Sequence, residues 1–344
     1  YVYGPPMPQP PTADAGPDQI VEATSASGAL VSLDGSNSSD ADGDTLAFEW
    51  RDSASQVVGN TAIVNLTLAL GVHSLTLTVD DGNGGMDSDT VQVTVQDTLA
   101  PSISIASPTG TSYALSQAVA ASYTCTDAVS GVASCEGTVA SGANIDTASA
   151  GSHDFTVTAT DSAGNTGSRT VPYTVTLGVP IITWADPAAI TYGTALGGAQ
   201  LNATASMSGT FTYTPAAGTV LNAGAGQPLH VDFVPTDTAN YTTAAADVTI
   251  TVNQGTPVLT WANPTSIVYG TALGGTQLNA TASVPGAFTY TPAAGTVLNA
   301  GAGQSLHVDF VPTDAVNYTT VAADVTITVT QATPVLTWAN PAAI

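Results

Sequence analysis

The sequence has no lysine and only two arginines, Arg51 and Arg169, against 26 acidic residues. The 344 residues therefore carry a formal net charge of −24 at pH 7. Nucleic acid and anionic lipid are bound through lysine and arginine contacts with phosphate, so neither binding to nucleic acid nor membrane insertion is expected. The absence of lysine also excludes Lys–Asn isopeptide crosslinks. Divalent cations fit such a chain better, although acidity alone more often serves solubility.

Long apolar runs and cysteines are also scarce. The sequence contains no run of about 18 apolar residues, the length that a membrane-spanning helix needs. It begins at Tyr1 without a signal peptide, as expected of a processed form or a fragment. Cys125 and Cys135 are the only cysteines. A lone pair in an otherwise thiol-free chain predicts a disulfide and an oxidising, extracellular compartment, since a two-cysteine metal site lacks its other ligands.

A repeat of 77 residues organises the second half of the chain. Trp184, Trp261 and Trp338 recur at this interval, and QLNATAS, LHVDFVPTD and NYTT recur with them between the first two copies. A fixed period of this length indicates an array of small domains. We expect the repeated tryptophan to pack between neighbouring domains. The segments TDTANY, residues 236–241, and TDAVNY, residues 313–318, have the form of tyrosine corners.

Short alternating runs such as ALVSLDGS, TLAFEW and HSLTLTV indicate antiparallel β-sandwiches. The predicted fold class is all-β, with four tandem antiparallel β-sandwich domains in an extended rod. The chain is too long for a single core. The predicted parts are a Pro-rich arm at 1–11, sandwiches at 12–97, 98–177, 178–254 and 255–331, and the orphan first strand of a further repeat at 332–344.

The first sandwich contains ADAGPDQIV, VSLDGSNSSDADGDTLAFEW and GVHSLTLTVDDGNGG. On these segments it resembles a polycystic-kidney-disease-type (PKD) domain, with FEWRD where many members have a WDFGDG-like segment. The resemblance places Trp50 on strand C, where sandwiches bury a large aromatic residue. Residues 98–177 are similar to bacterial Ig-like and hyalin-repeat-like modules. The 77-residue repeats are similar to the tandem Ig-like repeats of large surface and adhesin proteins.

Acidic residues gather in two loops of the first sandwich. The sequence D-A-D-G-D at 40–44 has the alternation with which calcium loops present carboxylates, and Gly43 permits a tight turn. The B–C and F–G loops of a sandwich meet at one end, so both acidic loops are expected in one region. The alternative is a solvated acidic turn. The predicted calcium ligands are Asp40, Asp42, Asp44, Asp80, Asp81 and Asn83, with a sparser set at Asp127, Asp161 and Asn165.

No arrangement of residues indicates catalysis. Serine, histidine and aspartate are present, but no serine lies on a nucleophile elbow, so we predict that the chain is not an enzyme. His230 and His307 are repeat copies beside Asp232 and Asp309, a pattern more typical of a surface hydrogen bond than of a metal site. The leading hypothesis is an extracellular structural protein, a cell-surface stalk or adhesin segment or a filament subunit. The alternative is a non-catalytic polysaccharide- or protein-binding accessory region of a secreted enzyme.

The segment 332–344 carries the filament hypothesis. Residues 333–341, TPVLTWANP, are identical to residues 256–264, which open the preceding repeat. An exposed apolar strand must be paired or covered, and pairing with a sheet edge of the next molecule would propagate into a filament. Val335, Leu336 and Trp338 would form that interface. The alternative is a cut within a longer array, so the expected partners are copies of the chain or neighbouring domains, with surface glycans or proteins as further partners.

Overall fold

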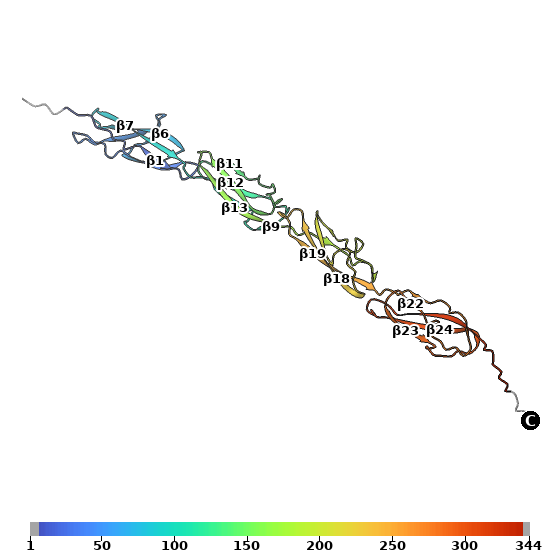
Figure 1. Ribbon diagram of the computed structural model, residues 1–344. Coiled ribbons are helices and arrows are strands. Elements are labelled where there is room, and N and C mark those ends of the chain that lie inside the picture. The colour runs from blue at the N-terminus through green and yellow to red at the C-terminus, as the bar shows by residue number, and fades with distance from the viewer. Residues whose placement is uncertain (1–6, 340–344) are drawn as a thin grey trace, which may run out of the picture. The chain divides into compact units, whose positions relative to one another are not determined.

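The computed structural model describes residues 7–339. Every regular element in this range is a β-strand, which confirms the all-β class (Figure 1). Among these residues no helix has the length and apolar character that crossing a membrane requires. The chain divides into two compact units, Tyr1–Gly178 and Val179–Ile344, and each unit contains two separate hydrophobic cores.

The first domain is a sandwich of a five-stranded sheet, ordered β1-β7-β6-β3-β4, and a β2-β5 pair. Inward residues alternate along β2, where Val31 and Leu33 are buried, because successive side chains of a strand point to opposite faces. Trp50 on β3 is fully buried, as predicted, and its indole N–H donates to the Thr61 carbonyl oxygen at 3.2 Å. The strands are β1 Gln19–Glu22, β2 Ala29–Asp34, β3 Ala47–Arg51, β4 Val57–Gly59, β5 Ile63–Leu68, β6 Gly71–Asp80 and β7 Met86–Gln96.

The second domain pairs a β10-β8 sheet with a four-stranded sheet ordered β11-β12-β13-β9. Cys125 on β10 and Cys135 on β11 form a disulfide between residues whose Cα atoms are 5.9 Å apart. The predicted disulfide is thus confirmed, and it joins the two sheets. The strands are β8 Ser102–Ser107, β9 Ser112–Ala114, β10 Ser122–Thr126, β11 Val132–Gly137, β12 Gly151–Asp161 and β13 Thr166–Thr176.

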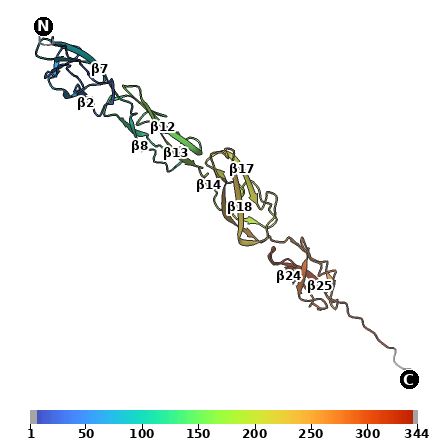
Figure 2. The ribbon, with the colours of Figure 1, turned by 90° about the vertical axis from the view of Figure 1, so that its left-hand side faces the viewer.

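The two repeats have the same topology. Each pairs two short strands, β14-β16 or β20-β22, over a four-stranded sheet ordered β15-β19-β18-β17 or β21-β25-β24-β23, and Figure 2 shows β17 beside β18. Phe233 and Phe310 are fully buried at matching positions. The strands are β14 Ile182–Thr183, β15 Ile190–Thr191, β16 Thr204–Ala205, β17 Gly209–Thr214, β18 Gly224–Pro235, β19 Ala244–Asn253, β20 Leu259–Thr260, β21 Ile267–Val268, β22 Thr281–Ala282, β23 Gly286–Thr291, β24 Gly301–Pro312 and β25 Val321–Thr330.

The repeated tryptophan packs inside its own repeat. The ring of Trp184 meets Tyr213 edge-on at 5.4 Å, and its indole N–H donates to the Gln200 carbonyl oxygen at 3.1 Å. Trp261 makes the same contacts with Tyr290 and Gln277. The expected packing of these tryptophans between neighbouring domains is therefore wrong, because each indole already fills the core beside its own strand.

Candidate functional site

The acidic loop of the first domain brings three carboxylates together. One oxygen each of Asp40, Asp42 and Asp44 lies within 4.8 Å of the others. Asp40 Oδ1 accepts the backbone N–H groups of Asp42 and Asp44 at 2.8 and 3.2 Å, and Gly43 completes the turn at φ 84°. Asp40 Oδ2 is buried and has no hydrogen-bond partner among the described residues. This is a set of hard oxygen ligands of the kind that Ca²⁺ prefers.

The loop after β6 meets this acidic loop, as predicted. The Asn83 side-chain amide donates to Asp44 Oδ2 at 2.8 Å. Asp81 is only 4% exposed, its Oδ1 accepts the backbone N–H of Asn83 at 2.7 Å, and its Oδ2 is buried without a partner among the described residues. Asp80 and Asp81 are not part of the close group, so three of the five expected carboxylates converge.

Residues 7–11 lie against the same end of the first domain. The Gln9 N–H donates to Asp42 Oδ2 at 2.7 Å, and Pro11 is buried. The described part of the predicted arm thus contacts the sandwich, while residues 1–6 lie outside the described range. A surface pocket here is lined by Met7, Pro8, Pro10, Asp81, Asn83, Gly84 and Gly85.

A second acidic group lies where the first domain joins the second. Oxygen atoms of Asp97, Asp127 and Asp161 lie within 4.8 Å of one another, and Asp97 and Asp161 are only 6% and 2% exposed. Asn165, predicted as a ligand here, donates its side-chain N–H to Asp161 Oδ2 at 2.8 Å. Asp97 was missed by the sequence analysis. Its one signal is its position between the last strand of one domain and the first strand of the next.

Hydrogen bonds in this second group favour the ionised form of Asp161. Burial raises the pKa of Asp161, but hydrogen bonds from Asn165 and from the backbone of Gly164 and Ala163 outweigh it and hold the pKa below its ordinary value. The chain has only two strong cations. Arg51 pairs with Glu49, and the Arg169 guanidinium donates to the Ile103 carbonyl oxygen. Buried carboxylates without a paired cation are costly, so a divalent ion suits this group chemically.

The histidines of the repeats form small hydrogen-bonded groups. Asp232 is 3.3 Å from His230 Nε2, as the sequence indicated, and Asp247 on the adjacent strand is closer, 2.7 Å from Nδ1. The hydrogen bond with Asp247, followed by that with Asp232, raises the pKa of His230 above its ordinary 6.5. In the second repeat the pKa of His307 is raised in the same way. The equivalent residues there are His307, Asp309 and Asp324.

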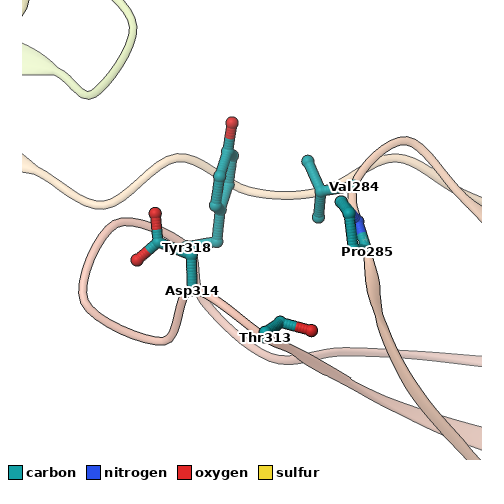
Figure 3. Close-up of a pocket in the computed structure, with 5 residues that line it drawn as sticks. All are labelled: Val284, Pro285, Thr313, Asp314 and Tyr318. Carbon is teal, nitrogen blue, oxygen red and sulfur yellow. The ribbon is translucent and has the colours of Figure 1, made fainter.

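The segment 313–318, predicted to be a tyrosine corner, turns its tyrosine toward the preceding repeat, whereas the corner at 236–241 stays a prediction. The backbone N–H of Tyr318 donates to the Asp314 carbonyl oxygen at 3.1 Å, and its ring lies edge-on to Tyr192 of the preceding repeat at 5.3 Å. Figure 3 shows the Tyr318 ring extending from its backbone beside a pocket lined by Val284 and Pro285. The tyrosine thus contacts the neighbouring repeat.

The described part of the orphan segment is exposed. Val335, Leu336 and Trp338 are 87%, 89% and 84% exposed, while residues 340–344 lie outside the described range. In the second repeat the equivalent Leu259 lies in β20 and Trp261 packs against the core. The segment therefore has the residues of a first strand without the sheet that such a strand needs.

Several solved structures have a limited likeness to this chain. The fibronectin(III)-like modules of Clostridium thermocellum CbhA are 14% identical, over 48% of this chain and 94% of theirs, with a TM-score of 0.21. Protocadherin gamma B2 extracellular cadherin domains 3–6 are 12% identical, over 94% of this chain and 100% of theirs, with a TM-score of 0.32. A nucleoside hydrolase-related protein from Saccharophagus degradans is 28% identical over 26% of each chain, with a TM-score of 0.21.

A search of curated proteins gives no match. A family model does match the first domain. It covers residues 8–95 and is described as the PKD domain. The match includes both acidic loops and the buried Trp50, and it begins within the segment that contacts the acidic end. The first domain of this chain therefore belongs to the PKD family.

Proposed function

We propose that the chain is an extracellular spacer, a stalk or adhesin segment built from tandem β-sandwiches. The carrying observation is a series of small domains with separate cores, in which a short, hydrogen-bonded connection joins the two repeats. Between the repeats, the Gln254 side-chain amide donates to the carbonyl oxygens of Ala315 and Val316 at 2.9 and 3.1 Å. A connection fixed in this way limits the swing of one repeat against the next.

The composition and the disulfide support an extracellular, non-catalytic role. A Cys125–Cys135 bridge persists in an oxidising compartment. PKD and Ig-like modules are typically non-catalytic, in keeping with the predicted absence of enzyme activity. Polysaccharide binding has less support, because carbohydrate platforms use exposed aromatic surfaces. Trp50 is fully buried and the indoles of Trp184 and Trp261 are bonded within their own repeats, which leaves Trp338 as the one exposed tryptophan among the described residues.

Small-angle X-ray scattering of the full chain tests the spacer function. A compact globule of this length would have a radius of gyration of about 20 Å. The spacer requires a value well above this, with the asymmetric distance distribution of an elongated particle, unchanged on dilution. A radius of gyration near that of the compact globule would contradict the proposal.

Strand donation is the second candidate, and the exposure of Leu336 and Trp338 favours it. Both described repeats, however, already hold their own first strand, β14 paired with β16 and β20 paired with β22. An incoming strand would have to displace a tethered strand that has the advantage of high effective concentration. The spacer is therefore the better supported of the two.

We also propose that the acidic end of the first domain binds calcium. Asp40, Asp42 and Asp44 supply the close oxygens, and the unpartnered buried Oδ2 atoms of Asp40 and Asp81 are acceptors that a cation would satisfy. Asp80 and Asn83 lie in the adjoining loop. The group at Asp97, Asp127 and Asp161 is a second candidate on the same chemical grounds.

Calcium should raise the melting temperature of the first domain in the full chain. A ligand that binds only the folded state at a hundredfold excess over its Kd stabilises it by about 2.7 kcal/mol. Asp42→Asn keeps a side-chain acceptor for the Gln9 N–H and removes one charge, so it should reduce the rise. Asp52→Asn, in a turn outside the close group, is the matched control and should leave the rise unchanged. If millimolar calcium does not change the calorimetric melting temperature of the first domain, these loops are solvated turns and the proposed calcium site is wrong.

A further inference from the structure

The end of the first repeat receives a loop of the second. Asn317 is 6% exposed, and its Oδ1 accepts the backbone N–H of Ala223 at 2.8 Å. Its Nδ2 donates to Asp314 Oδ2 at 2.8 Å and, over a longer 3.4 Å, to Asn222 Oδ1. Asp314 thus holds the amide in position, and the side chain of Asn317 satisfies a backbone donor of the preceding repeat.

The connecting segment completes this junction. The Gly255 N–H donates to the Asn317 carbonyl oxygen at 2.9 Å, and the Thr319 N–H donates back to the Gly255 oxygen at 3.0 Å. Gln254 holds the same loop through two backbone carbonyls. Together with the edge-on contact between Tyr192 and Tyr318, these bonds define an acceptor surface of Tyr192, Asn222, Ala223 and Gln254.

The same four residue types recur 77 positions later, at the far end of the second repeat. There they line an open pocket together with Ala332. Tyr269 is 50% exposed, and Asn299 and Ala300 are exposed, whereas Ala223 and Tyr192 in the covered copy are partly buried. The residues of this second acceptor surface are Tyr269, Asn299, Ala300 and Gln331.

We propose that this second surface is a docking site for the Thr-Asp-x-x-Asn-Tyr loop of a further Ig-like repeat of the same kind. The occupant follows from the covered copy, in which the same four residue types bind that loop. Docking would satisfy the Ala300 backbone N–H and cover the Tyr269 ring. The inference rests on the proposed spacer function, because it names the partner that extends the array.

One position differs between the two surfaces. Ala332 stands where the covered copy has Gly255, and a Cβ at position 255 would lie 3.3 Å from the Tyr318 ring. That separation is tighter than an ordinary contact, so a ring docked beside Ala332 must shift by a few tenths of an ångström. The hydrogen bonds to Ala300 and Gln331 do not depend on this Cβ.

Hydrogen exchange of the full chain provides the first test. The residues around Ala223 and Ala300 are identical, so a difference in exchange rate between these two amides reports on their structural environment. Peptides that extend to Pro228 or Ser305 differ in mass and can be told apart. We expect the amide of Ala223 to exchange at least roughly fivefold more slowly than that of Ala300, the effect of one net hydrogen bond. Asn317→Ala should remove the difference. Equal exchange in the unmodified chain would overturn the proposal at its starting point.

The second test supplies the occupant. A copy of residues 256–331 is inserted after Ala332 in the full chain, with the copy of Ser305 changed to Thr so that its peptides differ in mass. We expect Ala300 to become protected to the level of Ala223. Replacing the inserted copy of Asn317 by Ala should remove that protection, whereas Ala at the inserted copy of the exposed Val316 should not.

Slow exchange in the core strands of the inserted copy checks that it has folded in each variant. Unprotected Ala300 beside a folded inserted copy, or protection that survives the Asn-to-Ala change, would overturn the docking site. The two proposals fail separately, because a compact scattering profile with a protected Ala300 contradicts only the spacer.

Discussion

At the scale of single residues, many aspartates hold loops in shape as well as carrying charge. Asp40, Asp81 and Asp127 each accept backbone N–H groups from residues two to four positions ahead, which closes the loop around the carboxylate. The acidic composition is therefore partly a consequence of turn formation. Asp40, Asp42 and Asp44 meet within one such turn, whereas the turns at Asp127 and Asp161 meet at Asp97.

The paired histidines should make the stability of the repeats depend on pH. Asp247 and Asp232 raise the pKa of His230, and their equivalents raise that of His307. The charged histidine thus adds stability that is fully present below the unfolded pKa of about 6.5 and is lost as pH rises through the raised folded pKa. The His230→Gln/His307→Gln variant should lose more melting temperature relative to wild type at pH 6 than at pH 9.

The carboxylates supply the control for this prediction. Asp247→Asn with Asp324→Asn removes the nearer charge at each histidine and should lower both histidine pKa values in an NMR titration. A deficit of the glutamine variant that is the same at both pH values would show that these histidines stabilise by packing alone.

At the scale of elements, long strands carry the cores and short strands close them. In each repeat β18-β19 or β24-β25 forms the central hairpin, and its alternating apolar residues provide most of the buried core. The covering pair β14-β16 or β20-β22 contributes two residues per strand, and Trp184 or Trp261 directly follows β14 or β20. In the second domain the covering sheet consists of β8 and β10 alone, and the Cys125–Cys135 disulfide links it covalently to the other sheet.

The disulfide should matter for the second domain alone. It spans a sequence separation of 10 residues, and closing such a loop in the unfolded chain is worth roughly 2.5 to 3 kcal/mol. Cys125→Ala with Cys135→Ala should lower the calorimetric transition of the second domain accordingly. The transition of residues 179–344, which contain no cysteine, should stay in place. A reductant should lower the same transition in wild type and leave the variant unchanged. A change in the transition temperature of the repeats would contradict a stabilising effect confined to the second domain.

At the scale of the whole molecule, the state of the segment after Gln331 separates a spacer from a filament. Because both described repeats are filled by their own first strands, we expect the full chain and the 1–331 truncation to be monomers at high concentration. Static light scattering measures this directly. A mass that grows with concentration for the full chain, but not for the truncation or for Leu336→Asp, would favour strand donation instead.

The sequence by itself determined the all-β class, the 77-residue period and the Cys125–Cys135 bridge, while the burial of Trp50 followed from the resemblance to PKD domains. These features are local or periodic. Alternation along a strand decides which side chains face the core, and a repeated sequence must repeat its fold. The D-A-D-G-D loop was found for the same reason, since its carboxylates are two residues apart and need only one turn to meet.

Only the tertiary structure decided which distant residues meet. Asp97 reaches Asp127 and Asp161 because the first domain ends where the loops of the second begin. Asp247 reaches His230 through the register of two strands, and Asn317 binds Ala223 across 94 positions. Such contacts depend on the register between paired strands and on the contacts between neighbouring domains. Neither can be read from the spacing of residues in the sequence. The prediction for Trp184 failed for the same reason. The 77-residue spacing shows that the tryptophan has the same role in each repeat, but it does not show which residues the side chain contacts.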